Sequence, residues 1–200
     1  MAFDGLLGDA EHRGDFRDPA DLHDGKQHAV FYQLFLQTPE AEAGLGRDLR
    51  RTFRSQFYQL SGDRPPSAPG GLPAGMVPRK GAVLVDPPSL PSWITEADIN
   101  VYVEAFAQSG WHGPLAWWRN IDRGWELMAP FDGATVSVPA LYMAGEREMV
   151  VAAFEQAIAQ QSAFVPELRP AVMLPGCGHW TAQERPAEIS AGMIEFVRSL

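Results

Sequence analysis

Three ionisable side chains in the last third of the chain follow the ends of two predicted strands. The apolar run VPALYMAG (138–145) is followed by Glu146 and Glu148, and the apolar run RPAVMLPG (169–176) is followed by His179. In open α/β sheets, functional groups collect in the loops beyond the carboxyl ends of the strands. A neutral imidazole can take a proton from water when a carboxylate holds its other nitrogen and stabilises the imidazolium. The order of these residues therefore predicts an acid–base pair.

Two other interpretations of these residues stay open at this point. A lone histidine in the glycine-rich turn GCGHW can be an ordinary core or surface residue, and acidic residues after strands are usually solvated. A metal site is the weaker alternative, because the five histidines show no i, i+4 pair or other ligand spacing. These histidines are His12, His23, His28, His112 and His179. We expect neither a metal nor a cofactor.

The composition of the 200 residues is that of one ordinary globular domain, with 46% hydrophobic and 20% charged residues. A net charge of −9 argues against nucleic acid and against an anionic membrane surface as partners. The single cysteine, Cys177, rules out an internal disulfide and fits a reducing compartment. The sequence shows neither a signal-peptide pattern nor an apolar run of ~18 residues. We therefore expect a cytoplasmic protein.

The first half of the chain combines an irregular lead-in, a helix and a long loop. Residues 1–27 are expected to form a poorly ordered acidic lead-in. Thr38, Pro39 and Glu40 predict the start of a helix that continues through RDLRRTFRSQFYQL. Residues 61–92 hold eight prolines and five glycines, which predicts a long loop without regular structure.

The second half alternates predicted helices and strands. Thr95 and Gly110 bound one helix, whose apolar residues follow i, i+3, i+4, i+7 spacing. Gly113 and Pro114 begin the next, through LAWWRNIDRGWELM, and VAAFEQAIAQQ is also helical. Pro186 opens the last helix. Its predicted apolar stripe consists of Ile189, Met193, Phe196, Val197 and Leu200. Strand, helix, strand and helix in this order predict a parallel α/β arrangement.

Four stretches together resemble a known family. They are VFYQLFLQTPEAEAGLGRDLRRTFR, EADINVYVEAFAQSGWHGPLAWWRNIDRGWE, VPALYMAGERE and GCGHWTAQERPAEI. In this order they are similar to the cap and carboxyl-terminal part of soluble-type epoxide hydrolases of the α/β-hydrolase fold. The resemblance implies a partial α/β-hydrolase fold without its amino-terminal half. Residues 28–130 would form the helical cap, including loop 61–92, and residues 131–200 the carboxyl-terminal core part.

The resemblance also implies roles for individual residues. Tyr32 and Tyr102 match the two cap tyrosines, which bind the epoxide oxygen and protonate it. Glu148 matches the triad acid, normally aspartate, and His179 matches the base that activates water. The implied reaction opens an epoxide to a vicinal diol through an alkyl-enzyme ester.

Two further residues are candidates for contact with the substrate, and the assigned residues also have structural interpretations. The resemblance implies that Gln33 and Trp180 contact the substrate. From the residues alone, a role as core aromatic residues is favoured for both Tyr32 and Tyr102. Glutamate in place of aspartate adds one methylene, which changes the reach of the carboxylate at position 148.

The family's nucleophilic aspartate lies in a pattern similar to G-H-D-W-G-G, and nothing of that form occurs in the 200 residues. Asp24 is rejected, because no apolar strand precedes it and no amphipathic helix follows it. We therefore expect a truncated, frameshifted or split epoxide hydrolase that has little or no activity alone. The expected partners are a small apolar epoxide, water, and either a separately encoded amino-terminal half or a second copy. The alternatives are a non-catalytic remnant or binding module, or another α/β-hydrolase such as a haloalkane dehalogenase or an esterase.

Overall fold

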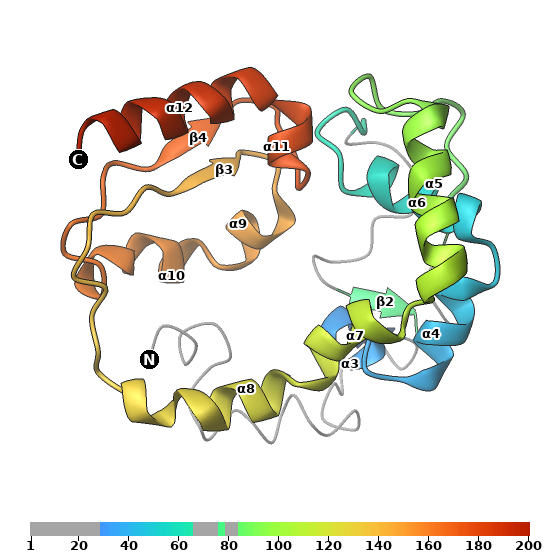
Figure 1. Ribbon diagram of the computed structural model, residues 1–200, viewed down its shortest axis with the longest axis horizontal. Coiled ribbons are helices and arrows are strands. Elements are labelled where there is room, and N and C mark those ends of the chain that lie inside the picture. The colour runs from blue at the N-terminus through green and yellow to red at the C-terminus, as the bar shows by residue number, and fades with distance from the viewer. Residues whose placement is uncertain (1–28, 66–75, 79–83) are drawn as a thin grey trace. The chain divides into compact units, whose positions relative to one another are not determined.

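The computed structural model describes residues 29–65, 76–78 and 84–200 (Figure 1). The predicted acidic lead-in and Asp24 lie outside the described residues, as do two segments of the predicted loop 61–92. The described residues divide into two units. The first contains 29–55, 76–78, 84–86 and 97–133, and the second contains 56–65, 87–96 and 134–200.

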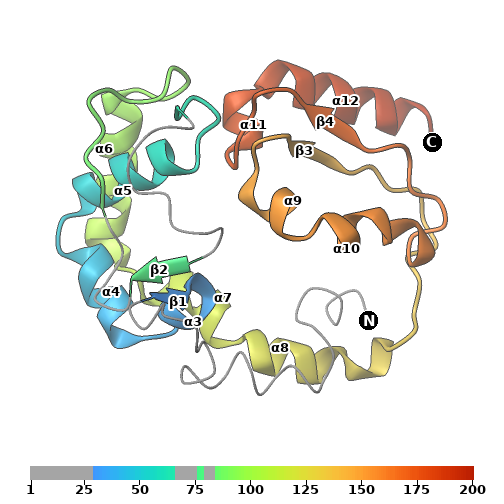
Figure 2. The same cartoon turned by 180° about the vertical axis from the view of Figure 1, so that it is seen from behind.

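The first unit is mainly helical and includes one short pair of strands, which Figure 2 shows from behind. Its elements are β1 (Ala29–Phe31), α3 (Tyr32–Phe35), α4 (Pro39–Gly46), α5 (Leu49–Gln59), β2 (Met76–Pro78), α6 (Glu96–Ser109), α7 (His112–Arg119) and α8 (Ile121–Met128). Helix α5 begins in the first unit and ends in the second, and Glu96 at the start of α6 belongs to the second.

Strand β2 corrects the prediction that loop 61–92 contains no regular structure. It pairs with β1 in antiparallel register, with Val30 opposite Val77. Val77 packs against a small core of Val30, Phe35 and Ala41, so burial of apolar side chains outweighs the high proline and glycine content here. Pro78 at the strand end is compatible with this pairing, because a two-stranded sheet has only edge strands.

The helix predicted from Thr38 begins as expected but is shorter than predicted. The Oγ1 atom of Thr38 accepts a hydrogen bond from the Ala41 amide at 3.2 Å, and Pro39 is the first helical residue. The prediction of one continuous helix was wrong, because α4 ends at Gly46 and α5 starts at Leu49. Asp48 between them accepts the Arg51 amide at 3.0 Å, which caps a new helix.

Helix α6 confirms the prediction for residues 96–109, and Gly110 ends it with a φ of 64°. Ile99 is completely buried. Phe53 of α5 contacts the rings of Phe106 at 4.9 Å and of Trp111 at 5.5 Å, so α5 and α6 share an aromatic core. The following helix was predicted to run from Gly113 without interruption. It instead begins at His112 and is divided at Asn120 into α7 and α8.

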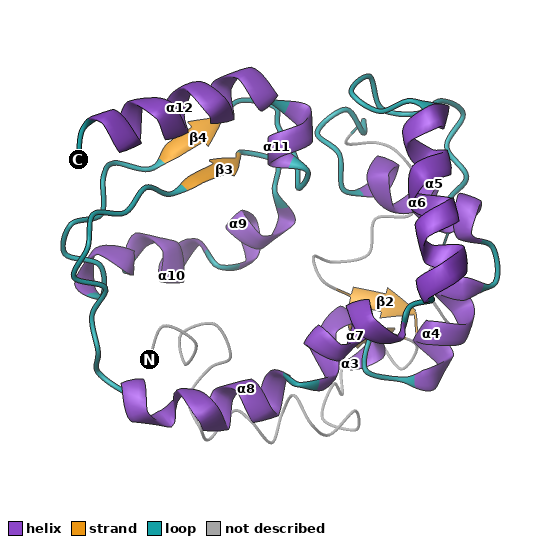
Figure 3. Cartoon of the chain, in the orientation of Figure 1, coloured by secondary structure: helices purple, strands orange, loops and turns teal. Residues whose placement is uncertain are grey.

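The second unit contains a two-stranded parallel sheet with helices on both faces. Its elements are β3 (Met143–Gly145), α9 (Met149–Ala153), α10 (Glu155–Ala159), β4 (Val172–Leu174), α11 (Thr181–Glu184) and α12 (Pro186–Arg198). Met143 pairs with Val172 and Gly145 with Leu174. Both views of the chain show β3 and β4 between α12 on one side and α9 with α10 on the other (Figures 1 and 2). Figure 3 shows the strand–helix alternation, which confirms the predicted parallel arrangement.

Several predicted features of this unit were wrong in extent or burial. The helix predicted at VAAFEQAIAQQ is two short helices separated at Phe154, whose φ of −125° is not helical. Both strands are shorter than the apolar runs that predicted them, and Val138 and Val172 are exposed. Two strands offer too little backbone pairing to order longer runs.

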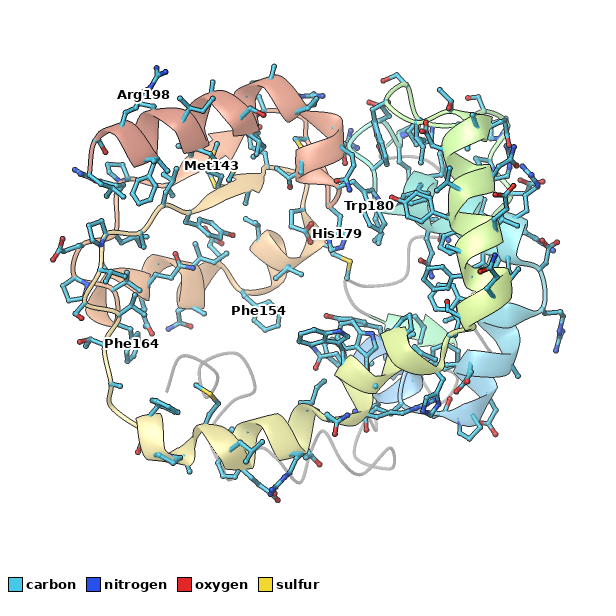
Figure 4. All side chains as sticks on the ribbon, in the orientation of Figure 1. Met143, Phe154, Phe164, His179, Trp180 and Arg198 are labelled. Atoms are coloured by element: carbon cyan, nitrogen blue, oxygen red, sulfur yellow. The ribbon has the colours of Figure 1, made fainter. Side chains whose placement is uncertain are left out.

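Helix α12 begins at Pro186 as predicted, but its apolar stripe is largely exposed. Met193, Val197 and Leu200 all have most of their surface accessible. The helix instead approaches the sheet at Gly192, where a Cβ atom would lie 2.7 Å from the Cε of Met143. Figure 4 labels Met143 beside this helix. The two-stranded sheet is too narrow to cover the whole stripe.

Candidate active site

The carboxyl ends of β3 and β4 lie at the same edge of the small sheet, and the loops that follow them are bound to each other. The amide of Glu146 donates to the Leu174 carbonyl at 3.1 Å, and the amide of Arg147 donates to the Cys177 carbonyl at 2.9 Å. Gly145 permits this approach, because a Cβ atom there would lie 2.3 Å from the Cys177 carbonyl oxygen. Parallel pairing therefore brings the glutamate loop to the histidine loop.

Glu148 and His179 meet at this edge. The Nδ1 atom of His179 lies 2.7 Å from Oε2 of Glu148, a short distance typical of a charge-assisted hydrogen bond. The other carboxylate oxygen, Oε1, accepts the Val150 amide at 2.9 Å at the start of α9. Both oxygens of Glu148 are thus occupied, and the extra methylene of glutamate is accommodated. Glu146, the other acid of this loop, is exposed.

The carboxylate determines which imidazole nitrogen carries the proton. Ionised Glu148 can only accept, so Nδ1 of His179 holds a proton and donates it to this hydrogen bond. In the neutral ring, Nε2 is then the basic nitrogen. The side chain of His179 is 42% exposed whereas that of Glu148 is 11% exposed. The base therefore remains accessible while its acid partner is shielded.

The pair shifts both pKa values toward the charged forms. The hydrogen bond that His179 donates to Glu148 is the largest influence on the pKa of His179 and raises it above its usual value, although burial opposes this. For Glu148, burial is the largest single influence and favours the neutral acid. The His179 hydrogen bond, the Val150 amide and the histidine charge together outweigh burial and lower the pKa of Glu148. Both directions mean that the interaction between the two side chains favours the imidazolium–carboxylate form of the pair.

Tyr32 and Gln33 lie together in the first unit, where α3 begins directly after β1. The Nε2 amide of Gln33 donates to the Tyr32 hydroxyl oxygen at 3.2 Å. The Tyr32 ring packs edge-on against Trp118 at 5.2 Å and against Phe31 at 4.9 Å. Because Gln33 occupies the acceptor side of the hydroxyl, the hydroxyl proton is directed toward another acceptor.

Tyr102 lies on α6 in the same unit and its ring contacts Phe53 at a centroid distance of 5.4 Å. It is partly buried and lies on the same apolar stripe as Ile99. In the first unit the structure thus places Tyr32 and Tyr102 within aromatic surroundings, and in the second it brings Glu148 and His179 into contact.

Trp180, the residue after His179, packs within the second unit. Its ring lies 4.7 Å from that of Phe57 and 5.0 Å from that of His179. Its indole Nε1 is buried and makes no hydrogen bond to any other described residue. Trp180 therefore forms an aromatic wall on one side of the base.

Sequence reasoning assigned no role to Glu184 or to the segment Leu60–Gly62, yet both contact the histidine loop. The amide of His179 donates to the Leu60 carbonyl at 2.9 Å. Glu184 is 6% exposed and accepts hydrogen bonds from Gly178 and Gly62, both at 2.9 Å. The one available signal was an acid in the short stretch between the glycine-rich turn and Pro186. No local pattern could have linked Leu60 to His179 across more than a hundred residues.

Two further observations concern the described part of the chain. Among its residues, no group of three or more histidine, cysteine, aspartate or glutamate side chains is arranged to hold a metal ion. None of the helices in residues 29–65 and 84–200 has both the length and the apolar character that crossing a membrane requires.

Comparison with known proteins identifies relatives of the chain. No family model matches it. Epoxide hydrolase A of Mycobacterium tuberculosis is 37% identical over 180 residues, covering 85% of this chain and 52% of the relative. Bifunctional epoxide hydrolase 2 of Rattus norvegicus is 33% identical over 172 residues, covering 84% of this chain and 29% of the relative.

Solved structures of epoxide hydrolases are similar to the chain as well. An epoxide hydrolase from an endophytic Streptomyces matches with a TM-score of 0.78 and 32% identity, covering 88% of this chain and 54% of that chain. Epoxide hydrolase A from Mycobacterium thermoresistibile matches with a TM-score of 0.75 and 32% identity, covering 98% and 55%.

The helical cap and the small parallel sheet define part of an α/β-hydrolase fold, which confirms the predicted fold class. The chain is a relative of the epoxide hydrolases, as its sequence stretches suggested. It spans about half the length of Epoxide hydrolase A and of the two solved structures, and less of the rat protein.

Proposed function

We propose that this chain supplies the acid–base pair and the proton donors of an epoxide-opening hydrolase. The observation that carries the proposal is the 2.7 Å contact between Nδ1 of His179 and the shielded carboxylate of Glu148. This contact leaves Nε2 as the base for a water molecule, and Glu148 compensates the charge that develops on the ring. A relative that aligns with 85% of the chain is named an epoxide hydrolase, which supports this choice of chemistry.

The first chemical step is ring opening. A carboxylate outside these 200 residues attacks one epoxide carbon, the ring carbon–oxygen bond breaks, and a tyrosine proton passes to the alkoxide. Tyr32 suits this role, because the Gln33 amide donates to its hydroxyl oxygen and stabilises the phenolate that remains. Tyr102 is the second donor. The products of this step are an alkyl-enzyme ester and a tyrosinate.

The second step is hydrolysis of that ester. His179 takes a proton from water at Nε2, and the hydroxide adds to the ester carbonyl carbon. The tetrahedral adduct expels the diol oxygen, which takes the proton of the added hydroxyl group and leaves the carboxylate restored. The imidazolium releases its proton to solvent and the tyrosinate takes one from solvent, so both groups return to their starting forms. The net reaction adds one water to one epoxide and gives a vicinal diol.

The nucleophile sets the condition for activity. The sequence contains no G-H-D-W-G-G-like turn around an aspartate. A site with its base but without its nucleophile retains only the assistance of the remaining groups. We propose that the 200 residues alone turn over epoxides slowly or not at all, and that a separately encoded segment carrying the nucleophile completes the site. The proposed substrate is a small apolar epoxide, with Gln33 and Trp180 as further contacts.

A chimera tests the proposal directly. Residues 29–200 replace the aligned part of Epoxide hydrolase A of Mycobacterium tuberculosis, whose own amino-terminal half is kept. We expect the chimera to form diol from an aryl epoxide. His179→Gln should stop turnover and leave one substrate mass attached to the protein, because ester formation does not need the base.

A matched control accompanies this variant. Glu188→Gln changes an exposed acid on α12 and should leave turnover unchanged. A folded chimera that forms neither diol nor ester would contradict the proposal, as would undiminished turnover in His179→Gln. Parallel assays with an aryl ester and a haloalkane distinguish the alternative reactions of the same fold.

A further inference from the structure

The loop that carries His179 is held by three consecutive backbone hydrogen bonds. The amides of Gly178 and Trp180 donate to the two oxygens of Glu184, at 2.9 Å and 3.2 Å. The His179 amide between them donates to the Leu60 carbonyl at 2.9 Å. Peptide groups on both sides of the histidine are therefore fixed, and with them the direction in which its side chain leaves the backbone.

Glu184 also binds the segment that follows α5. Its Oε2 accepts the Gly62 amide at 2.9 Å, in addition to that of Gly178. Gly62 and Gly178 allow this close approach, since a Cβ atom at Gly62 would lie 2.7 Å from Oε2 of Glu184. The carboxylate is thus a buried acceptor for three backbone N–H groups from two separate segments. A charge buried at 6% exposure is tolerated when it is hydrogen-bonded in this way.

The same segment is bound to the loop of the acid. Arg147, next to Glu148, donates through its guanidinium to the carbonyls of Gly62 and of Arg64, the latter at 2.6 Å. Residues 60–64 therefore contact the backbone of the histidine loop on one side and Arg147 of the glutamate loop on the other. In addition to the direct backbone bonds between the two loops, this segment therefore helps to fix the relative position of base and acid.

We propose that Glu184, anchored through the amide of Gly62, is the positioning residue that holds His179 in register with Glu148. The inference deepens the proposed function, because it rests on His179 acting as the base. Glu184 touches neither water nor substrate in this role. It acts through the backbone of the histidine loop.

An amide at position 184 cannot replace the carboxylate. Glutamine offers one acceptor oxygen and one NH2 group. At one of the two positions that an oxygen now occupies, the NH2 group would therefore face a backbone N–H and no hydrogen bond would form. With the oxygen at the Oε2 position, Gly178 and Gly62 keep their acceptor and Trp180 loses its own. The opposite orientation loses two bonds. Glu184→Gln therefore breaks the Trp180 bond first, whereas Glu184→Ala removes all three.

Hydrogen exchange and histidine NMR on the 200-residue chain test the inference. In folded Glu184→Gln we expect the Trp180 amide to lose about tenfold or more of its protection, because a hydrogen bond to a charged acceptor is lost. The pKa of His179 should fall toward its ordinary value, since the contact with Glu148 loosens and the Glu184 charge is removed. Other charged groups near this junction are Asp63, Arg147, Arg185 and Glu188. Glu188→Gln removes the same charge from an exposed site, and it should change neither the protection of the Trp180 amide nor the pKa of His179.

A second variant separates geometry from charge and from folding. Gly62→Ala keeps every charge but forces the added Cβ against the Gly176 carbonyl, the Glu184 carboxylate and the Gly178 amide. It therefore displaces the same junction without removing a charge, and it should also lower the pKa of His179 if circular dichroism shows a folded chain. Folded Glu184→Gln and Gly62→Ala that both keep the wild-type His179 pKa and Trp180 protection would overturn the inference. These readings need no epoxide, so they are independent of the proposed function. In the active chimera, Glu184→Gln should lower kcat more than it changes KM.

Discussion

Gly178→Ala probes the junction on which the acid–base pair depends. A Cβ atom at this position would lie 2.4 Å from the Gly62 nitrogen, 2.5 Å from the Leu60 carbonyl oxygen and 2.7 Å from the Ser61 carbonyl carbon. All three atoms belong to the backbone, so no side-chain rotation relieves the contact. Gly178 is not among the glycines with positive φ, so alanine can adopt its backbone conformation. The variant therefore acts through the steric clash of its Cβ atom with segment 60–62 and not through backbone strain at position 178.

The magnitude follows from these distances. Non-bonded heavy atoms are comfortable at about 3.5 Å, so segment 60–62 must move away by about 1 Å. That movement breaks the 2.9 Å bond from His179 to Leu60 and stretches the Gly178 and Gly62 bonds to Glu184. Each lost bond costs about 0.5–1.5 kcal/mol, and overpacking costs about 1–3 kcal/mol. We expect the free energy of unfolding to fall by about 2–5 kcal/mol.

Urea unfolding followed by tryptophan fluorescence measures this loss, because Trp180 and Trp93 both pack against Phe57 near the junction. Gly44→Ala is the matched control. A Cβ atom there has no neighbour within 4 Å, and alanine in a helix interior is neutral or stabilising by up to about 1 kcal/mol. A Gly178→Ala protein as stable as the wild type, with the His179 amide still protected, would refute the reasoning.

Three further predictions concern the pair and its supporting helix. Glu148→Gln should lower the pKa of His179, measured by NMR titration, whereas Glu146→Gln should leave it unchanged because that side chain is exposed. Because the pKa of Glu148 is lowered from 4.5 and that of His179 raised from 6.5, the pair stabilises the fold most between these values. The stability difference between wild type and Glu148→Gln should therefore shrink as pH falls through the folded pKa of Glu148 or rises through that of His179. A constant difference across that range would contradict this. Thr38→Ala should cost about 1 kcal/mol in urea unfolding, while Thr38→Ser, which keeps the hydroxyl acceptor for Ala41, should cost less.

Local sequence signals predicted the elements whose causes are local. The Thr38 cap, the apolar spacing that begins at Ile99 and the terminating Gly110 all act within a few residues, and α4 and α6 start or end where they indicate. The two apolar runs before Glu148 and His179 predicted parallel strands for the same reason. Helix continuity was predicted less well, because the breaks at Asp48, at Asn120 and at Phe154 depend on small differences between capping and propagation.

Which distant segments meet follows from the packed fold and not from any local pattern. The order of residues along the chain indicates the acid and the base and, through strand order, the sheet edge where they lie. It could not determine that Glu148 reaches His179 while also capping α9, nor that β2 pairs with β1 across a stretch rich in proline. The contacts of Glu184 with Gly62, and of His179 with Leu60, join residues more than a hundred positions apart. Such contacts arise from packing of the whole chain, because backbone groups buried at a junction must find partners wherever the fold brings them.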